Sequence, residues 1–215
     1  MTYRLALFDF DGTLADTFPL FLRLLAPIAE EFRFRAPESH DLDALRRMNT
    51  ASILASLGVP RWKLPAILRC ARGRMAAERD GIRLFDGIAP MLQSLTHRDV
   101  RLAVVSSNNE DTVRHVLGAP LCESIQTFSC GVGLFGKSAK IRRTLARCRV
   151  QPMHAAFVGD EERDVAAARR AGVTSVAVTW GYASEPALTE AQVVCRSVPE
   201  LEAALVHSAP SGYPS

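Results

Sequence analysis

The chain has 215 residues, of which 48% are hydrophobic and 23% charged, values that suit one large globular domain or a core with an insertion. Its net charge of +3 is too small to indicate a nucleic-acid-binding surface. The five cysteines lack metal-ligand spacing, and no apolar run is long enough for a signal peptide or a membrane span, so we expect a cytoplasmic protein without nucleic-acid or membrane partners.

The N-terminal part of the chain predicts one strand followed by helices. The apolar run Leu5–Phe8 predicts a strand over residues 4–9, and a loop follows it. Apolar residues at helical spacing then predict helices over residues 17–34, 41–48, 50–57 and 62–79. Pro27 is expected to kink or break the first of these helices. No strand pattern is visible between residues 15 and 80.

From residue 85 onwards, expected strands alternate with expected helices. The strands cover residues 102–105, 125–128, 155–158, 175–178 and 193–194. The helices cover residues 88–97, 111–117, 138–148, 161–171 and 199–206. This alternation is typical of right-handed βαβ units, so we predict an α/β fold whose parallel sheet is interrupted after its first strand by a helical insertion.

Two carboxylates follow the first strand. Asp9 and Asp11 alternate about Phe10, so in an extended chain both side chains point the same way, about 6–7 Å apart. One carboxylate can attack phosphorus, and the other can protonate the leaving oxygen and then activate water. The alternative is a hairpin turn at Asp11-Gly12, which predicts a returning strand where a helical pattern follows instead.

A second pair of carboxylates, Asp160 and Asp164, follows the strand at residues 155–158. The two are four residues apart and share one face of a helix. Ligands of open α/β sheets bind beyond the carboxyl ends of the strands, where Asp9 also lies. Clustered carboxylates repel one another unless a cation lies among them, which indicates a Mg²⁺ site for phosphoryl transfer. The alternative is helix capping by Asp160, which gives Asp164 no role.

Two further candidates lie near helix starts. Ser106 follows the strand at 102–105, where its hydroxyl and nearby backbone N–H groups, including that of Ser107, can hold a phosphate oxygen. Capping of the next helix by Ser107 or Asn108 is the alternative explanation. Lys137, one of only three lysines, opens a helix, where the macrodipole disfavours a cation. This placement suggests that Lys137 neutralises an anion.

The segment from Gly131 to Ser138 also matches the P-loop pattern G-x-x-x-x-G-K-[ST], which leaves a nucleotide hydrolase as an alternative function. A P-loop explains neither the Asp9 segment nor Asp164. The carboxylate interpretation accommodates both, together with Ser106 and Lys137, so we prefer it.

At these segments the chain resembles the haloacid dehalogenase superfamily of phosphatases. The matching motifs are Asp9-Phe10-Asp11-Gly12-Thr13, the strand ending in Ser106, Lys137, and Gly159-Asp160 with Asp164. The resemblance implies that Asp9 is the nucleophile and Asp11 the acid/base. It implies that Ser106 and Lys137 bind the transferring phosphoryl group. It also implies a Mg²⁺ ion held by Asp9, the Asp11 carbonyl and Asp160, with Asp164 acting directly or through water.

The resemblance further implies a Rossmann-like core, from residues 1–14 and 86–207, with an all-helical cap at residues 15–85. The polar end of the sequence, residues 208–215, is expected to form a disordered tail. Phosphoglycolate-phosphatase-type members are the most similar, so we expect a Mg²⁺-dependent phosphatase acting on a small phosphorylated metabolite through an aspartyl-phosphate. A hexose-phosphate mutase on the same fold stays as an alternative, and the oligomeric state is open. Specificity is expected in the cap, where the candidates are Arg33, Arg35, Arg46, Arg47 and Arg61.

Overall fold

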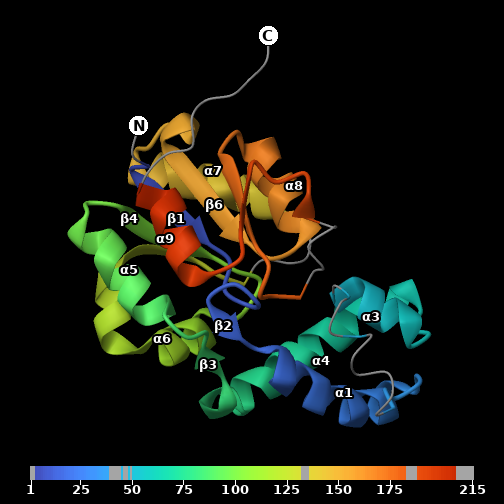
Figure 1. The fold of residues 1–215 in the computed structure, drawn as a ribbon. Helices are drawn as coiled ribbons and strands as arrows, with labels where there is room; N and C mark the ends of the chain where they lie inside the picture. The colour runs from blue at the N-terminus through green and yellow to red at the C-terminus, as the bar shows by residue number, and fades with distance from the viewer. Residues whose placement is uncertain are drawn as a thin grey trace.

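The computed structural model describes residues 3–38, 45, 48, 50–131, 136–182 and 188–206. Its centre is a six-stranded parallel sheet with the spatial order β5-β4-β1-β6-β7-β8 (Figure 1). The strands are β1 (Leu5–Phe8), β4 (Arg101–Val105), β5 (Ile125–Ser129), β6 (Ala155–Gly159), β7 (Thr174–Val178) and β8 (Val193–Cys195). The predicted α/β class is therefore confirmed.

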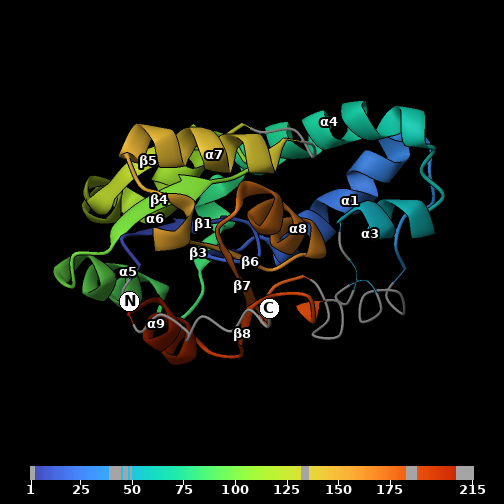
Figure 2. The ribbon, with the colours of Figure 1, turned by 90° about the horizontal axis from the view of Figure 1, so that it is seen from above.

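Helices cover both faces of this sheet, because alternate residues of a strand point to opposite sides. Ala6 and Phe8 pack with α5 (Ile88–His97), α6 (Glu110–Ser124) and α9 (Val198–Val206). Leu5 and Leu7 pack with α7 (Lys137–Cys148) and α8 (Glu162–Ala171). Figure 2 shows α7 and α9 on opposite sides of the sheet. Burial on both faces is why the central strands are continuous apolar runs in the sequence.

A second group of helices lies away from the sheet (Figures 1 and 2). It consists of α1 (Phe18–Phe32), α3 (Thr50–Ser56) and α4 (Leu64–Ala77), which we call the cap helices, together with short 3-10 turns at Arg61–Lys63 and Arg79–Gly81. Helix α1 continues across Pro27, so this proline does not end it. Most of the helix expected at 41–48 lies outside the described residues, as does the expected tail.

Two short strands, which the sequence analysis did not predict, join the cap helices to the sheet. β2 (Ala15–Asp16) pairs antiparallel with β3 (Arg83–Leu84). The expectation of no strand between residues 15 and 80 is therefore wrong at β2, because two residues are too few to reveal a period of two. The pairing holds the entry to and the exit from the cap side by side. The exact domain boundaries stay a prediction.

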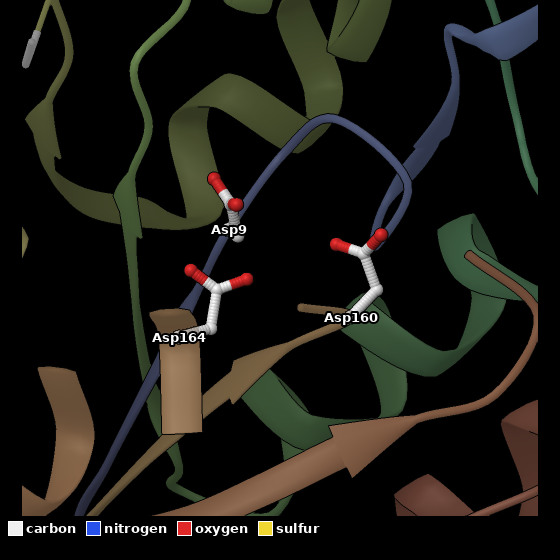
Figure 3. Close-up of side chains that lie close together, drawn as sticks. All are labelled: Asp9, Asp160 and Asp164. Atoms are coloured by element: carbon white, nitrogen blue, oxygen red, sulfur yellow. The ribbon is translucent and has the colours of Figure 1, made fainter. Parts of the chain in front are cut away.

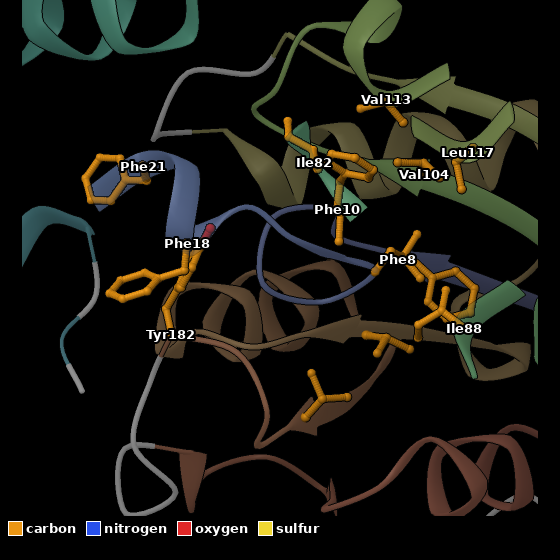
Figure 4. Close-up of a cluster of buried hydrophobic side chains, with 14 of the residues drawn as sticks. Phe8, Phe10, Phe18, Phe21, Ile82, Ile88, Val104, Val113, Leu117 and Tyr182 are labelled. Atoms are coloured by element: carbon orange, nitrogen blue, oxygen red, sulfur yellow. The ribbon is translucent and has the colours of Figure 1, made fainter. Parts of the chain in front are cut away.

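The hydrophobic core continues from the sheet into the base of the cap (Figure 4). Phe8 and Phe10 are fully buried at the end of β1. The ring of Phe18, in the first turn of α1, lies 5.3 Å from the ring of Tyr182, in the segment after β7. The hydroxyls of Thr17 and Tyr182 are hydrogen-bonded. These contacts fix the start of α1 against the carboxyl edge of the sheet.

Three smaller features complete the fold. Helix α6 is longer than the predicted 111–117, although Gly118 interrupts it with a φ of 75° and a ψ of 162°. No helix in the described part of the chain is long and apolar enough to cross a membrane. All five cysteines are free thiols.

Candidate active site

Three buried carboxylates meet at the carboxyl edge of the sheet (Figure 3). Asp9 directly follows β1, Asp160 directly follows β6, and Asp164 lies in the first turn of α8. Oxygen atoms of the three carboxylates all lie within 4.8 Å of one another. Segments of the chain that are far apart in sequence therefore bring their negative charges to one point.

Lys137 lies between two of these carboxylates at the start of α7. Its Nζ is 2.6 Å from Oδ2 of Asp9 and 2.5 Å from Oδ1 of Asp164. Burial lowers the pKa of the Lys137 ammonium, but Asp164 and Asp9 more than offset this effect and place the pKa above its ordinary value. Lys137 is therefore a charged, buried residue and not a solvated surface lysine.

The carboxylates carry more negative charge than their surroundings favour. The pKa of Asp9 is raised to about 6, because burial and repulsion from Asp164 together outweigh the lowering effect of Lys137. Burial also raises the pKa of Asp160 well above its usual range, with further repulsion from Glu161. Closely spaced carboxylate oxygens are the ligands that Mg²⁺ prefers, and a divalent cation would compensate the excess charge. The residues present thus fit a Mg²⁺ site.

Asp160 is held rigidly by the loop after β1 and by the segment after β7. The hydroxyl of Thr13 donates to Oδ1 of Asp160 over 2.9 Å, and the backbone N–H of Tyr182 donates to Oδ2 over 2.8 Å. Gly12 and Gly181 both approach this carboxylate so closely that a Cβ at either position would clash with it. Gly12 also has a φ of 75°, which favours glycine. The Asp-Gly-Thr motif therefore helps to position Asp160.

Glu161, and not Asp160, is the N-cap of α8. Its side chain accepts a hydrogen bond from the backbone of Asp164, and Asp164 Oδ2 accepts one from the backbone N–H of Glu161 over 3.2 Å. The capping alternative considered for Asp160 is thus wrong, and Asp164 does have a structural role. The capping box leaves the other oxygen of Asp164 facing Lys137.

Asp11 is not one of the three clustered carboxylates. Oδ1 of Asp11 accepts a hydrogen bond from Nδ2 of Asn108 over 2.8 Å, and the residue lines a cleft below the cap helices. Burial raises the pKa of the Asp11 carboxyl, whereas the hydrogen bonds from Asn108 and Thr17 lower it. A raised pKa suits a carboxyl group that must hold a proton before donating it.

Ser106 and Ser107 directly follow β4. Ser106 is fully buried, and its hydroxyl oxygen accepts a hydrogen bond from the backbone N–H of Asn108 over 2.9 Å. Ser107 lines the cleft beside Asp11. The N-cap of α6 is Asn109, which accepts from the backbone of Asp111. The alternative in which Ser107 or Asn108 caps the helix is therefore wrong.

A family model of haloacid dehalogenase-like hydrolases matches residues 6–178. The chain belongs to this family. The resemblance inferred from the motifs is confirmed, and with it the expectation of a hydrolase of the phosphatase type.

Individual relatives agree with this assignment. The chain is 30% identical over 186 residues to a phosphoglycolate phosphatase of Synechococcus elongatus, which covers 86% of this chain and 88% of the relative. It is 28% identical over 183 residues to the tyrosine-protein kinase PtkA of Mycobacterium tuberculosis, across 83% of this chain and 63% of that protein. The solved structure of a predicted phosphatase from Clostridium acetobutylicum has the same fold, with a TM-score of 0.80, 23% identity, and coverage of 95% and 99%.

The haloacid dehalogenase-like fold also explains the P-loop pattern at residues 131–138. Residues 132–135 lie outside the described part of the chain, but Gly136 and Lys137 are described. The ammonium of Lys137 contacts Asp9 and Asp164, as a residue of the carboxylate cluster. The P-loop match is thus accounted for by a lysine that belongs to this cluster.

The sequence analysis missed several residues at this site. Asn108 and Tyr182 follow strands at the same sheet edge as Ser106. The rule that residues beyond the carboxyl ends of the strands line the ligand site therefore applies to them as well. Arg163 lies inside the motif around Asp160 and was passed over in favour of the aspartates. Arg72 had no distinguishing signal, because residues 15–85 hold twelve Lys and Arg residues.

Two clefts lie between the cap helices and the carboxyl edge of the sheet. One of about 370 Å³ is bounded by Arg72 and by the segments after β4 and β5. The other, of about 70 Å³, lies beside Asp11 and is lined by residues including Arg72 and Arg163. Arg33, Arg35 and Arg61, the predicted specificity residues that the structure describes, are exposed and line neither cleft; Arg46 and Arg47 lie outside the described residues.

Proposed function

We propose that this haloacid dehalogenase-like hydrolase is a Mg²⁺-dependent phosphatase that hydrolyses a small phosphorylated metabolite through an aspartyl-phosphate. The observation that carries the proposal is the environment of Asp9, which lies beside a buried lysine and two further carboxylates. Asp11, two residues on, instead lines a cleft below the cap helices. The charge of Asp9 is thus compensated by Lys137, whereas the raised pKa of Asp11 favours its protonated form.

Asp9, Asp160 and Asp164 are the side chains that we propose hold Mg²⁺, together with the backbone carbonyl of Asp11. Asp164 acts directly or through water. The bound ion would supply Lewis-acid stabilisation of negative charge on the phosphoryl oxygens. The mutual approach of the three carboxylates to within 4.8 Å and their burial support this assignment.

The protein's own residues carry the two chemical steps. A carboxylate oxygen of Asp9 attacks phosphorus in line while the bond to the ester oxygen breaks, and Asp11 donates its proton to that oxygen. Asp11 then removes a proton from the water that attacks the phosphorus of the aspartyl-phosphate, which releases inorganic phosphate and restores Asp9. Lys137 and the serines at 106 and 107 bind the phosphoryl oxygens, and the cap helices exclude bulk water during the first step.

The substrate is proposed to be a small phosphate monoester, because phosphoglycolate phosphatases are among the relatives at about 30% identity over most of the chain. A hexose-phosphate mutase on the same fold would use the same core residues, but it would return the phosphoryl group to a sugar and not to water. The cytoplasmic location and the absence of nucleic-acid and membrane partners stay predictions.

The test is phosphate release from a panel of phosphorylated metabolites, ranked by kcat/KM, in EDTA and with added Mg²⁺. We expect turnover only with Mg²⁺ and its abolition in Asp9→Asn. The matched control is Asp86→Asn, because Asp86 is an exposed aspartate in the turn before α5 and should leave turnover unchanged. Equal turnover in EDTA, or wild-type turnover by Asp9→Asn, would contradict the proposal, and isomerised sugar phosphate without free phosphate would indicate a mutase.

A further inference from the structure

Arg163 lies beside the carboxylates of the candidate active site, in the first turn of α8. It lines the cleft of about 70 Å³ that also contains Asp11. The other cation at the site, Lys137, contacts Asp9 and Asp164 from the start of α7 and is not among the residues that line this cleft. The lysine is therefore enclosed by the carboxylate cluster, whereas the arginine is open to a ligand that enters through the cleft.

An ion pair with Glu161 positions the guanidinium of Arg163. Its Nη2 donates to Oε1 of Glu161 over 2.6 Å. The Glu161 side chain is only 4% exposed, whereas that of Arg163 is 30% exposed. Glu161 is itself fixed as the N-cap of α8 by the capping box with Asp164. A buried carboxylate on a rigid helix start thus holds the arginine in place at the cleft.

The guanidinium of Arg163 keeps hydrogen-bonding capacity that the chain does not use. A guanidinium has five N–H donors, and within the described part of the chain only the bond to Glu161 engages them. The Nε atom is one of two buried side-chain polar atoms that lack a hydrogen-bond partner among the described residues. An exposed arginine without a partner is hydrated, but a buried donor is not, and buried donors nearly always have an acceptor. The unused donors therefore indicate an acceptor from outside the chain.

The charge balance of the site points to an anionic acceptor. Five carboxylates meet two cations here: Asp9, Asp11, Asp160, Glu161 and Asp164 against Lys137 and Arg163. Burial lowers the pKa of the Arg163 guanidinium, but Glu161 and Asp164 more than offset this and place the pKa above its ordinary value. A Mg²⁺ ion would cancel two negative charges. Without Arg163, a phosphate ester would still enter a negative site, even with a proton on Asp11.

We propose that Arg163 is a further phosphate-binding residue, whose guanidinium binds oxygens of the phosphoryl group from the cleft, and that Glu161 is its positioning residue. The inference rests on the proposed phosphatase function and deepens it, because it adds a contact to Lys137 and the two serines. The planar fork of a guanidinium matches two phosphate oxygens. Since Asp11 lines the same cleft, this contact also holds the ester beside the proposed acid.

The experiment measures two dissociation constants by calorimetry, that of Mg²⁺ alone and that of inorganic phosphate in the presence of Mg²⁺. In Arg163→Met we expect phosphate to bind about 10-fold to 100-fold more weakly, because a charge-assisted contact is lost. We expect Mg²⁺ to bind more tightly, by roughly 3-fold, because a nearby positive charge is removed. The matched control is Arg170→Met, which removes the same charge from an exposed position of α8 that lines neither cleft, and both constants should stay within about 2-fold of wild type.

The opposite signs of the two changes separate phosphate binding from a merely structural role. A site that is disrupted by the substitution would lose affinity for both ions. Arg163→Lys keeps the charge but not the fork, so it should recover part of the phosphate affinity. With ethyl phosphate as substrate, KM should rise in Arg163→Met and rise less in Arg163→Lys.

A double variant covers the case in which Arg163→Met does not fold because Glu161 is left buried and unpaired. Glu161→Gln combined with Arg163→Met removes both charges of the pair, and the amide oxygen can still accept the capping hydrogen bond from the backbone of Asp164. The net charge of the protein is unchanged in this variant. A loss of phosphate affinity by about 10-fold would therefore report the lost contact and not the long-range field.

The outcomes distinguish this inference from the proposed function. If wild type binds phosphate and Arg163→Met loses that affinity, but no ester is hydrolysed, the proposed function fails and this inference stands. Full phosphate affinity in Arg163→Met or in the double variant would overturn the inference, as would a wild-type protein that does not bind phosphate. A joint loss of Mg²⁺ and phosphate affinity in Arg163→Met would also overturn it, because Arg163 would then have a structural role only.

Discussion

The ammonium nitrogen of Lys137 lies 2.6 Å from Oδ2 of Asp9, although the two residues are 128 positions apart in the chain. Both side chains are buried, so each charge is favoured by the other. A nucleophilic carboxylate must be ionised, and burial works against ionisation: even beside the lysine, the pKa of Asp9 is raised to about 6. The lysine opposes that effect and keeps Asp9 closer to its reactive form.

Replacing Lys137 with Met should therefore affect both activity and stability. We expect turnover to fall by at least about 100-fold, because the lost charge stabilises the transition state. We also expect the free energy of unfolding to fall by about 3–5 kcal/mol, because Asp9 and Asp164 lose their buried partner. Steady-state kinetics and urea denaturation measure the two effects.

Lys63→Met is the control for this variant, since the Lys63 ammonium donates to the carbonyl of Phe32 in the cap. It should change stability by only about 1 kcal/mol and leave the chemical step intact. A Lys137→Met enzyme as active as Lys63→Met would remove the lysine from the mechanism.

Asn108→Ala should move the pH profile of the enzyme. The hydrogen bond from Asn108 lowers the pKa of Asp11, so its loss raises that pKa. Asp11 must be protonated in the first step, and the descending limb of kcat/KM for ethyl phosphate should therefore move to higher pH. The neighbouring variant Asn109→Ala should cost about 1 kcal/mol of stability by removing a helix cap, without moving this limb. A limb that moves to lower pH in Asn108→Ala would exclude Asp11 as the acid.

Gly12→Ala and Gly58→Ala form a pair matched in backbone conformation. Their φ values are 75° and 76°, so alanine is strained at both positions. A Cβ at Gly58 has no atom within 4 Å, whereas one at Gly12 would clash with the carboxylate of Asp160. Gly58→Ala should lower the free energy of unfolding by about 1–2 kcal/mol, and Gly12→Ala should lower it by more. Gly12→Ala should also weaken Mg²⁺ binding. Thermal unfolding measures the first effect and calorimetry the second. Equal losses of unfolding free energy and equal Mg²⁺ affinities in the two variants would contradict the close contact between Gly12 and the Asp160 carboxylate.

The metal-free protein should lose stability as the pH rises. Burial raises the pKa of Asp9 to about 6 and that of Glu161 to about 7, both above unfolded values of about 4. Between about pH 4 and about pH 7 the folded state therefore binds more protons than the unfolded state, so the stability of the folded state falls as the pH rises through this range. The Tm in EDTA should be lower at about pH 7.5 than at about pH 5, by roughly 2–4 °C for each kcal/mol lost.

Added Mg²⁺ should reverse this trend, because it binds the deprotonated carboxylates. The increase in Tm on adding Mg²⁺ should be larger at about pH 7.5 than at about pH 5. Comparing the two conditions at each pH cancels the contribution of groups outside the site. An equal increase at both pH values would mean that the clustered carboxylates do not hold the ion.

Much of the fold and of the carboxylate cluster could be predicted because the physical signals are local. Strands buried on both faces appear as apolar runs, such as Leu5–Phe8, and polar residues directly after them fall at one sheet edge. This rule predicts that Asp9 and Asp160 lie at the same edge. Lys137 stood out because lysine is rare in this chain and is disfavoured at a helix start.

Other features depend on contacts that the sequence does not display. The two-residue strands β2 and β3 have no visible periodicity, and their pairing joins residues almost 70 positions apart. The N-cap of α8 is Glu161 and not Asp160, because the Asp160 carboxylate is instead hydrogen-bonded to Thr13 and Tyr182. Arg72 is one of many cap arginines, and only the packing of α4 over the sheet edge distinguishes it.

The most direct test of the account is a rapid-quench experiment with a ³²P-labelled phosphate monoester and Mg²⁺. The account predicts an acid-stable, hydroxylamine-sensitive label on the peptide that contains Asp9, formed and discharged at rates compatible with turnover and absent from Asp9→Asn. Steady turnover with no label on that peptide, or a label that persists in Asp9→Asn, would contradict the covalent role of Asp9.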